Sequence, residues 1–349
     1  MSQHDSTAKD IRGDCGIHIT FRNFHGSVQH YYHFLFAFVV PLIRVWNSIT
    51  ISAYVTNIFV RSCAIMDELL YQLRLPGLVI MDATEHAAMY DRRAQSANSA
   101  GLQFITLDGY DDPVRYDAGV FRSVRDLLHF RFSDEIRREM QEINESFTGS
   151  GPRIVIITRL PADKFYSQAD CEIKTAGSER RSIANVEELR AAASLRSDNV
   201  VVAALEGRSL FYQMALFAAA DVVISQHGAA LGNLIWCKDT TTVIEIIPKE
   251  RKDGIQECDY FGDLARCLSL KYYRLWQDLP HGPVDIADFT NILHTITANA
   301  SAVRSPSTIL SSLPKDSGSS RMKVTRRSVW LTWQRLRNLT AHAVGRRAS

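Results

Sequence analysis

Apolar runs alternate with helix-like segments along most of the chain, and the alternation is most regular after a turn at residues 148–152. Runs rich in β-branched residues predict strands at 153–159, 199–207, 221–226 and 241–248. The segments between them predict helices that begin near Asn185, at 209–220 and at 228–237. Buried strands that alternate with helices are typical of parallel sheets covered on both faces, so this half predicts a doubly wound α/β domain.

The first half shows a less regular version of the same pattern. We expect strands at 15–21, 48–55, 77–82 and 103–112, the last ending in an acidic turn, and helices at 60–73 and 123–147. The most hydrophobic stretch, residues 31–46, predicts a buried helix, with a re-entrant membrane segment as the alternative. It is shorter than the ~20 apolar residues that span a bilayer, and Pro41 and Arg44 interrupt it.

The character of the chain changes toward both ends. Residues 1–16 are polar and lack the apolar core of a signal peptide, and residues 298–320 have the Ser- and Pro-rich composition of a linker. Residues 321–349 hold eight basic residues and no acidic one. They predict a basic amphipathic helix on an anionic membrane surface, with a disordered basic tail or a helix packed on the body as the alternative. Between these segments we expect two domains, at 17–150 and 151–297.

Composition narrows the possible partners. The chain has 349 residues, 46% of them hydrophobic, and a formal net charge of +2. That charge gives no global attraction to nucleic acid or membrane, so we expect no nucleic-acid partner. The six cysteines form no C-x-x-C pair and no secreted-type framework, so reduced thiols in a cytoplasmic protein are expected.

Polar residues follow or lie in several strands of the predicted C-terminal sheet, including Arg159, Glu206, His227 and Glu245. Ligands of open parallel sheets bind beyond the carboxyl ends of the strands, so these residues should converge on one crevice. Gly228 would permit a tight turn in which backbone N–H groups face a bulky anion. On this evidence alone His227 is either a core histidine or a phosphate donor.

An arginine pair and a glutamine can each be interpreted either as ligand contacts or as residues without a ligand. Arg180 and Arg181 precede the helix at Asn185, which Asn185 can cap with Glu188 in the capping-box position. The arginines form either an anion clamp or a solvated basic loop. Gln213 lies among apolar residues and is either a satisfied core amide or a ligand contact.

No Asp-x-Asp occurs in the chain, and no His/Cys cluster has zinc spacing. We therefore expect no metal and no cofactor. A phosphate site in this chain would depend on arginine, histidine and backbone N–H groups instead.

Taken together, these segments resemble glycosyltransferase family 61, the DUF563-type transferases. The resemblance rests on five elements in order: "ITR" ending at Arg159, "RRSIANVEEL" at 180–189, Gln213, "ADVVISQHGAALGN" at 220–233 and "VIEIIP" at 243–248. The His-containing aromatic segment at 30–42 is similar to the N-terminal segment of the family.

The resemblance implies a GT-B-like α/β fold, in which two Rossmann-like domains with parallel sheets face each other across a cleft. It implies an inverting, metal-independent transferase that moves a sugar from a nucleoside diphosphate donor, a UDP-sugar first, to a glycan or lipid-linked acceptor in polysaccharide assembly. The donor-binding residues it implies are Arg159, Arg181, Asn185, Gln213, His227, Gly228, Ala229 and Glu245, with Glu245 on ribose or sugar hydroxyls.

The general base that inversion requires is not fixed by the sequence. Many relatives carry an Asp three or four residues after the histidine of the N-terminal helix, where this chain has Phe36 and Ala37 after His33. The candidate bases are His33, Glu85, Asp108 and Asp111.

The missing Asp leaves a catalytically inactive glycan- or nucleotide-binding protein of the same fold as the alternative. A Rossmann enzyme that uses another phosphorylated cofactor would be expected to carry G-x-G-x-x-G, which is absent from the chain.

Overall fold

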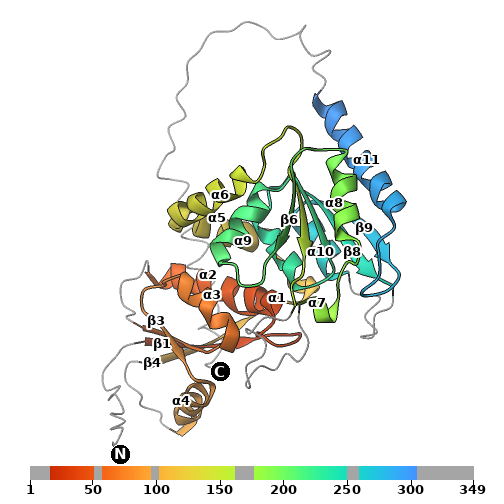
Figure 1. Cartoon of the computed structure of the whole chain (residues 1–349). Coiled ribbons are helices and arrows are strands. Elements are labelled where there is room, and N and C mark those ends of the chain that lie inside the picture. The colour runs from red at the N-terminus through yellow and green to blue at the C-terminus, as the bar shows by residue number, and fades with distance from the viewer. Residues whose placement is uncertain (1–15, 51–56, 96–101, 162–176, 250–258, 305–349) are drawn as a thin grey trace, which may run out of the picture. The chain divides into compact units, whose positions relative to one another are not determined.

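A computed structural model describes residues 16–50, 57–95, 102–161, 177–249 and 259–304 (Figure 1). Residues 1–301 form one compact unit, which contains both sheets. Residues 302–349 form a second unit, of which only the last helical residues, 302–304, are described. The predicted N-terminal segment, except Gly16, and the predicted basic tail lie outside the described residues, so the membrane-binding interpretation of the tail stays a prediction.

The first sheet has four parallel strands: β1 (Gly16–Arg22), β2 (Asn57–Arg61), β3 (Leu78–Met81) and β4 (Leu102–Asp108). Their order is β3-β2-β1-β4, with Gly16 paired to both Asn57 and Leu102. The strand order therefore reverses between β1 and β4. This reversal is the topological switch point of the sheet.

The second sheet has five parallel strands: β5 (Ile154–Thr158), β6 (Val200–Ala204), β7 (Val222–Gln226), β8 (Thr242–Pro248) and β9 (Lys271–Gln277). Their order is β6-β5-β7-β8-β9, so the switch point lies between β5 and β7. Two parallel sheets with helices confirm the α/β class.

Helices connect the strands in both sheets. In the first half they are α1 (Tyr31–His33), the π-helix η1 (Phe34–Val39), α2 (Val40–Thr50), η2 (Ala64–Met66), α3 (Asp67–Gln72), α4 (Ala83–Gln95), η3 (Pro113–Arg115), α5 (Ala118–Arg131) and α6 (Ser133–Glu145). In the second half they are α7 (Gly177–Arg180), α8 (Val186–Ser194), α9 (Leu210–Ala219), the 3₁₀ helix η5 (Ala229–Trp236), α10 (Tyr260–Cys267) and α11 (Ile286–Arg304).

The five-stranded sheet is covered on both faces. Along β5, Ile154 and Ile156 pack in a cluster with residues of α8 and α11, while Val155 and Ile157 belong to a separate cluster with residues of α9 and α10. All four side chains are at most 3% exposed. Burial on both faces explains why these strands are uninterrupted apolar runs in the sequence.

The apolar segment at 31–46 is a buried helix, as predicted, although its middle third is a π-helix. Residues 34–43 are all buried, and all but Ala37 and Pro41 belong to the same cluster as Leu231 and Leu234 of η5. Tyr31 Oη donates to Asn233 Oδ1 at 2.6 Å, which joins this helix to the second half of the chain. No helix in the described part of the chain combines the length and apolarity needed to cross a membrane.

Three predicted elements of the first half were wrong in detail. Ser48–Thr50, expected in a strand, end helix α2, while 51–56 lie outside the described residues. Val60 and Arg61, expected in a helix, belong to β2. The helix expected at 123–147 is two helices, because Phe132 leaves the helical conformation at φ −112° and ψ 31°.

Two features of the second half also differ from expectation. Asn185 precedes α8 without capping it through its side chain. Its amide instead donates to Val284 O at 3.0 Å and accepts from Val284 N at 2.9 Å, so it links α8 to the segment before α11. Helix α11 continues to Arg304, past residue 298, where the linker was expected to begin.

Candidate functional site

Two arginines converge at the switch point between β5 and β7. Arg159 follows β5, and its Nη2 donates to the carbonyl oxygen of His227 at 3.0 Å. Arg181, only 8% exposed, donates from Nη1 to the same oxygen at 2.7 Å. Two guanidinium groups on one carbonyl concentrate positive charge, and an anion at this point would offset their mutual repulsion.

Gly228 provides the close approach that this cluster needs. Its φ is 155°, and a Cβ at this position would lie 2.1 Å from Nη2 of Arg159. Ala229 then begins η5, whose first N–H groups have no partner within the helix. The first N–H groups of η5 thus belong to the same turn as the glycine beside Arg159, and their binding of an anion stays a prediction.

His227 is held from behind by a buried carboxylate. Its Nδ1 lies 2.5 Å from Oε1 of Glu245, which is 1% exposed. Tyr272 Oη donates to the other oxygen of Glu245. Burial and the Glu245 carboxylate raise the pKa of Tyr272, so this phenol stays protonated and can donate. Glu245 thus orients His227, whereas the family resemblance implied that it contacts ribose or sugar hydroxyls.

A pocket is lined by the two arginines and by Gly228, whereas His227 is not among its lining residues. Its basic lining consists of Arg159, Arg180, Arg181 and Arg208, with Glu68 and Glu206 as its acidic residues. Met66 and Leu69, from η2 and α3, supply apolar surface. Gly228 and Ala229 line it as well, whereas Asn185 and Glu245 are not among its lining residues. A basic pocket with one apolar wall suits a ligand that carries phosphates and an apolar group.

Gln213, also on the pocket lining, belongs to a buried amide network. Its Oε1 accepts from Nδ2 of Asn233 at 3.0 Å. Asn233 is fully buried, and its Oδ1 accepts from both Tyr31 Oη and Trp236 Nε1. Gln213 is therefore a satisfied core amide that also lines the pocket, and its contact with a ligand stays a prediction.

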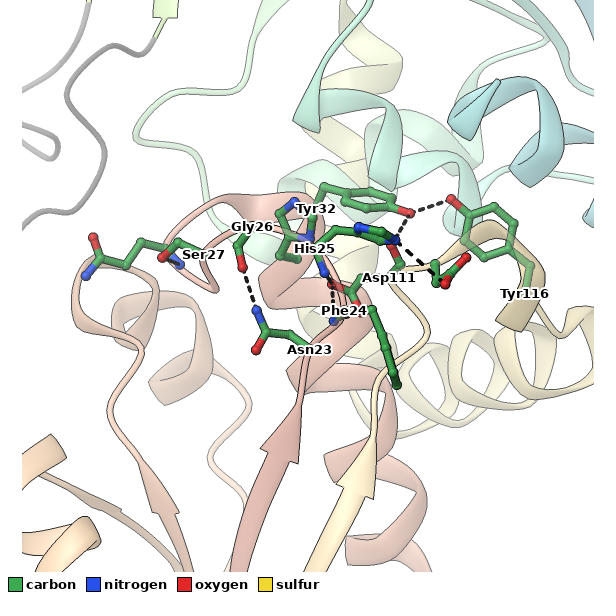
Figure 2. A network of polar contacts seen from close by, with 11 residues as sticks. Asn23, Phe24, His25, Gly26, Ser27, Tyr32, Asp111 and Tyr116 are labelled. Carbon is green, nitrogen blue, oxygen red and sulfur yellow. Dashed lines mark hydrogen bonds and ion pairs between the residues drawn. The ribbon is translucent and has the colours of Figure 1, made fainter. Parts of the chain in front are cut away.

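The switch point of the four-stranded sheet carries different chemistry. Asp111, in the loop after β4, is fully buried, and its carboxylate accepts backbone N–H groups of Phe24 and His25 at 3.1 Å each. Figure 2 shows the loop after β1 around this carboxylate. Nδ1 of His33 lies 3.0 Å from Oδ2 of Asp111. Burial alone would raise the pKa of Asp111, but the hydrogen bonds from His33, Phe24 and His25 lower it below its ordinary value.

His33 presents its other ring nitrogen to a glycine. Gly26 has φ +64°, and a Cβ there would lie 2.5 Å from Nε2 of His33. A larger residue would cover that nitrogen. The His33 side chain is 16% exposed, and its ring centroid lies 6.3 Å from that of His30, which lines the arginine pocket. The histidine and carboxylate pair thus lies beside the pocket.

A tyrosine pair closes the other side of this histidine. Tyr32 Oη is hydrogen-bonded to Tyr116 Oη (Figure 2). Tyr116 Oη also donates to the carbonyl oxygen of Tyr260 at 3.2 Å. Burial, with the neighbouring phenol and carboxylate groups, raises the pKa of both Tyr32 and Tyr116. Both phenols therefore stay neutral and serve as fixed walls rather than as bases.

The structure separates the remaining candidate bases from this pair. Asp108 ends β4 and is paired with Arg22 at 3.4 Å and Arg115 at 3.2 Å. Glu85 is exposed on α4. Of the four candidates, His33 and Asp111 alone contact each other, 78 residues apart in the sequence. Gly26 and Tyr272, which our sequence analysis did not single out, complete the two clusters.

Among the described residues, no three His, Cys, Asp or Glu side chains are grouped so as to hold a metal ion. The polar groups that converge on the pocket are instead guanidinium groups and backbone amides.

The sequence model of the family described as Glycosyltransferase 61 matches residues 31–244. The chain belongs to this family. The match covers more than half of the chain and includes every predicted site residue except Glu245, which follows its last position. The matched segment includes β4, β5 and β7, whereas β1 precedes its first residue.

A curated relative is Beta-1,2-xylosyltransferase XAX1 of Oryza sativa subsp. japonica, 31% identical to this chain over 151 residues. The alignment covers 43% of this chain and 22% of that protein. The chain therefore spans less than a quarter of the curated relative that it matches.

Proposed function

We propose that this member of the glycosyltransferase 61 family is an inverting, metal-independent transferase. It moves a sugar from a nucleoside diphosphate donor to a hydroxyl of a glycan or lipid-linked acceptor. The observation that carries the proposal is an arginine-lined pocket beside a histidine and carboxylate pair. The two parallel sheets agree with a GT-B-like arrangement in which the second sheet takes the donor.

The donor diphosphate binds to Arg159, Arg181 and the N–H groups that follow Gly228. Negative charge accumulates on the diphosphate as the bond to the sugar breaks. Fixed cationic donors at that point stabilise the transition state more than the ground state. Glu245 and Tyr272 orient His227 at the edge of the same cluster.

His33 serves as the general base. The acceptor oxygen attacks C1 of the donor sugar, its proton moves to Nε2 of His33, and the bond from C1 to the diphosphate oxygen breaks. Asp111 accepts the hydrogen of Nδ1 and stabilises the imidazolium that forms. The lowered pKa of Asp111 keeps it ionised for this role. The base is thus a residue of the helix in which relatives carry an additional carboxylate.

The proposal is tested with a panel of nucleotide sugars. Thermal shift reports binding, because a ligand of the folded state raises its stability with occupancy. UDP-sugars come first, and UDP-xylose is included because the rice relative is named as a xylosyltransferase. Turnover is measured as UDP release with oligosaccharide acceptors, and the anomeric configuration of the product is read by NMR.

The outcomes separate the two candidate functions. A donor that binds and is turned over with inversion supports the proposal. A donor that binds with no turnover on any acceptor supports the inactive nucleotide-binding alternative. Failure of all nucleotide sugars and of UDP to bind would remove the donor site itself.

A further inference from the structure

Glu206 occupies a corner of the pocket that the proposed chemistry does not use. It follows β6 in a tight turn, in which the N–H of Arg208 donates to the carbonyl oxygen of Leu205 at 3.1 Å. Gly207 supplies the left-handed conformation of this turn, with φ 71°. Residues 205–208 all line the pocket. The turn therefore fixes the Glu206 carboxylate at the pocket wall.

One oxygen of this carboxylate is unsatisfied. Oε2 of Glu206 is buried and has no hydrogen-bond partner among the described residues. A buried acceptor without a partner is costly, and more so when it belongs to a charged group. Because Glu206 also lines the pocket, a donor group on a ligand in this corner would satisfy the carboxylate.

The chemistry of the missing partner is restricted. A carboxylate only accepts hydrogen bonds, so the partner must be an N–H or O–H group. A phosphate oxygen would repel it. In a nucleoside diphosphate sugar, the donors nearest to the phosphates are the hydroxyls of the ribose on one side and of the transferred sugar on the other.

The strand order puts this carboxylate within reach of a group bonded to the phosphates. Strand β6 neighbours β5, whose end carries Arg159, and lies two strands from β7. Adjacent strands are about 4.8 Å apart, so Glu206 is about one strand spacing beyond the diphosphate cluster. That spacing is close to the step from a phosphate to its ribose. The pocket lining extends over the turn after β6 in this direction.

We propose that Glu206 binds the ribose of the donor by accepting a hydrogen bond from one of its hydroxyls, which rests on the proposed function for the presence of a nucleotide. Arg208 belongs to the same turn, and its guanidinium carbon lies 4.6 Å from the centroid of the Tyr212 ring. The positive charge of Arg208 offsets the negative charge of Glu206. Glu206 is then a specificity determinant that distinguishes ribonucleotides from deoxyribonucleotides and from the free diphosphate.

The test measures ligand affinity by calorimetry for the full chain and for Glu206→Ala. The ligands are UDP, 2′-deoxy-UDP, 3′-deoxy-UDP, N3-methyl-UDP and pyrophosphate. We expect Glu206→Ala to weaken UDP binding by about tenfold or more, the usual effect of a hydrogen bond to a charged group. Pyrophosphate binding should change by less than about twofold.

Discrimination between ligands identifies the group that Glu206 contacts. The wild-type chain should prefer UDP to one of the deoxy nucleotides, and Glu206→Ala should lose that preference. Glu206→Gln retains the shape of the side chain and serves if the alanine variant does not fold. Glu145→Gln, on the exposed end of α6, removes the same charge outside the pocket and should leave all affinities unchanged.

The remaining outcomes overturn the inference in distinguishable ways. If UDP binds and its preference over both deoxy nucleotides survives in Glu206→Ala, Glu206 does not bind ribose and the proposed function stands. If the variant instead loses discrimination against N3-methyl-UDP, the contact is to the base. If the wild-type chain binds neither UDP nor pyrophosphate, the proposed function fails together with this inference.

Discussion

The two sheets of this chain have the same kind of switch point but different chemistry at it. Between β1 and β4 lies a buried carboxylate paired with a histidine, and between β5 and β7 lie two arginines on one carbonyl. One cluster is suited to moving a proton, and the other is suited to holding an anion. The topology thus selects where each site lies, and the loop residues select what it does.

The largest effect is expected at the proton-transfer cluster. His33→Ala should lower kcat by about 10²- to 10⁴-fold, the usual contribution of a general base, because no other group takes the acceptor proton. The Kd for UDP should change by less than about twofold. Steady-state UDP release and calorimetry measure the two quantities.

The carboxylate of the same cluster provides the matched comparison. Asp111→Asn should also lower kcat, because an amide stabilises the imidazolium less well than a carboxylate. An unchanged kcat in His33→Ala would show that this cluster is structural and that the comparison between the two switch points is wrong.

Substitutions in the anion-binding cluster should weaken UDP binding, which His33→Ala should leave nearly unchanged. Arg159→Ala and His227→Ala should each weaken UDP binding by about 10- to 100-fold, since each removes a charge-assisted or orienting contact. Circular dichroism should show an intact fold in both variants. Unchanged UDP affinity in both would remove this assignment.

A smaller effect is expected from the glycine between these groups. In Gly228→Ala the added Cβ meets Arg159 and the backbone keeps an unfavourable φ, so the free energy of unfolding should fall by about 1–3 kcal/mol. Donor binding should weaken as the guanidinium is displaced. Gly232→Ala is the control, because its nearest atoms would be 3.6 Å away, in ordinary contact. Equal losses of stability in both variants would contradict the special role of Gly228.

The smallest effect concerns the outer face of the first sheet. There His18 is fully buried, neither ring nitrogen has a hydrogen-bond partner in the described structure, and its ring is stacked on His86 at 4.0 Å. Burial and the neighbouring His86 lower the pKa of His18 from 6.5 to about 4. The unfolded chain therefore binds more protons between these two values. The free energy of unfolding should rise with pH across that window and keep this contribution above pH 6.5.

His18→Leu should reduce that pH dependence while changing stability little at pH 7.5, since it replaces unsatisfied nitrogens by an apolar group. Urea unfolding at several pH values measures the slope. The exposed His281→Gln variant should keep it. A slope that persists unchanged in His18→Leu would place its origin elsewhere.

Sequence patterns predicted strands best where local and tertiary preferences agree. The runs at 153–159 and 241–248 are β-branched and buried on both faces, so the strands β5 and β8 follow directly. Ile49 and Thr50 are β-branched as well, but they continue helix α2. Packing context, which decides such cases, is not contained in a short sequence window.

The two clusters also differed in how far the sequence could predict them. The arginine cluster could be predicted because Arg159, Arg181 and His227 each follow or precede an element whose end the sequence reveals. The pairing of His33 with Asp111 could not be chosen from the four candidate bases. It depends on β1 lying next to β4 in the sheet, and on backbone N–H groups of the loop after β1. The sequence held one clue to the loop at this site, because Gly26 follows His25 in a stretch that is typical of a turn.

The hydrogen bond from Tyr31 to Asn233 has a consequence for synthesis of the chain. Its partners are 202 residues apart, and the helix that carries Tyr31 is buried against the same distant segment. At about 5–20 residues per second, a ribosome needs about 10–40 s to reach the second partner after the first has been made. During that interval the apolar helix that begins at Tyr31 lacks the part of its cover that η5 supplies. The nascent first half therefore exposes apolar surface until the second half has been made.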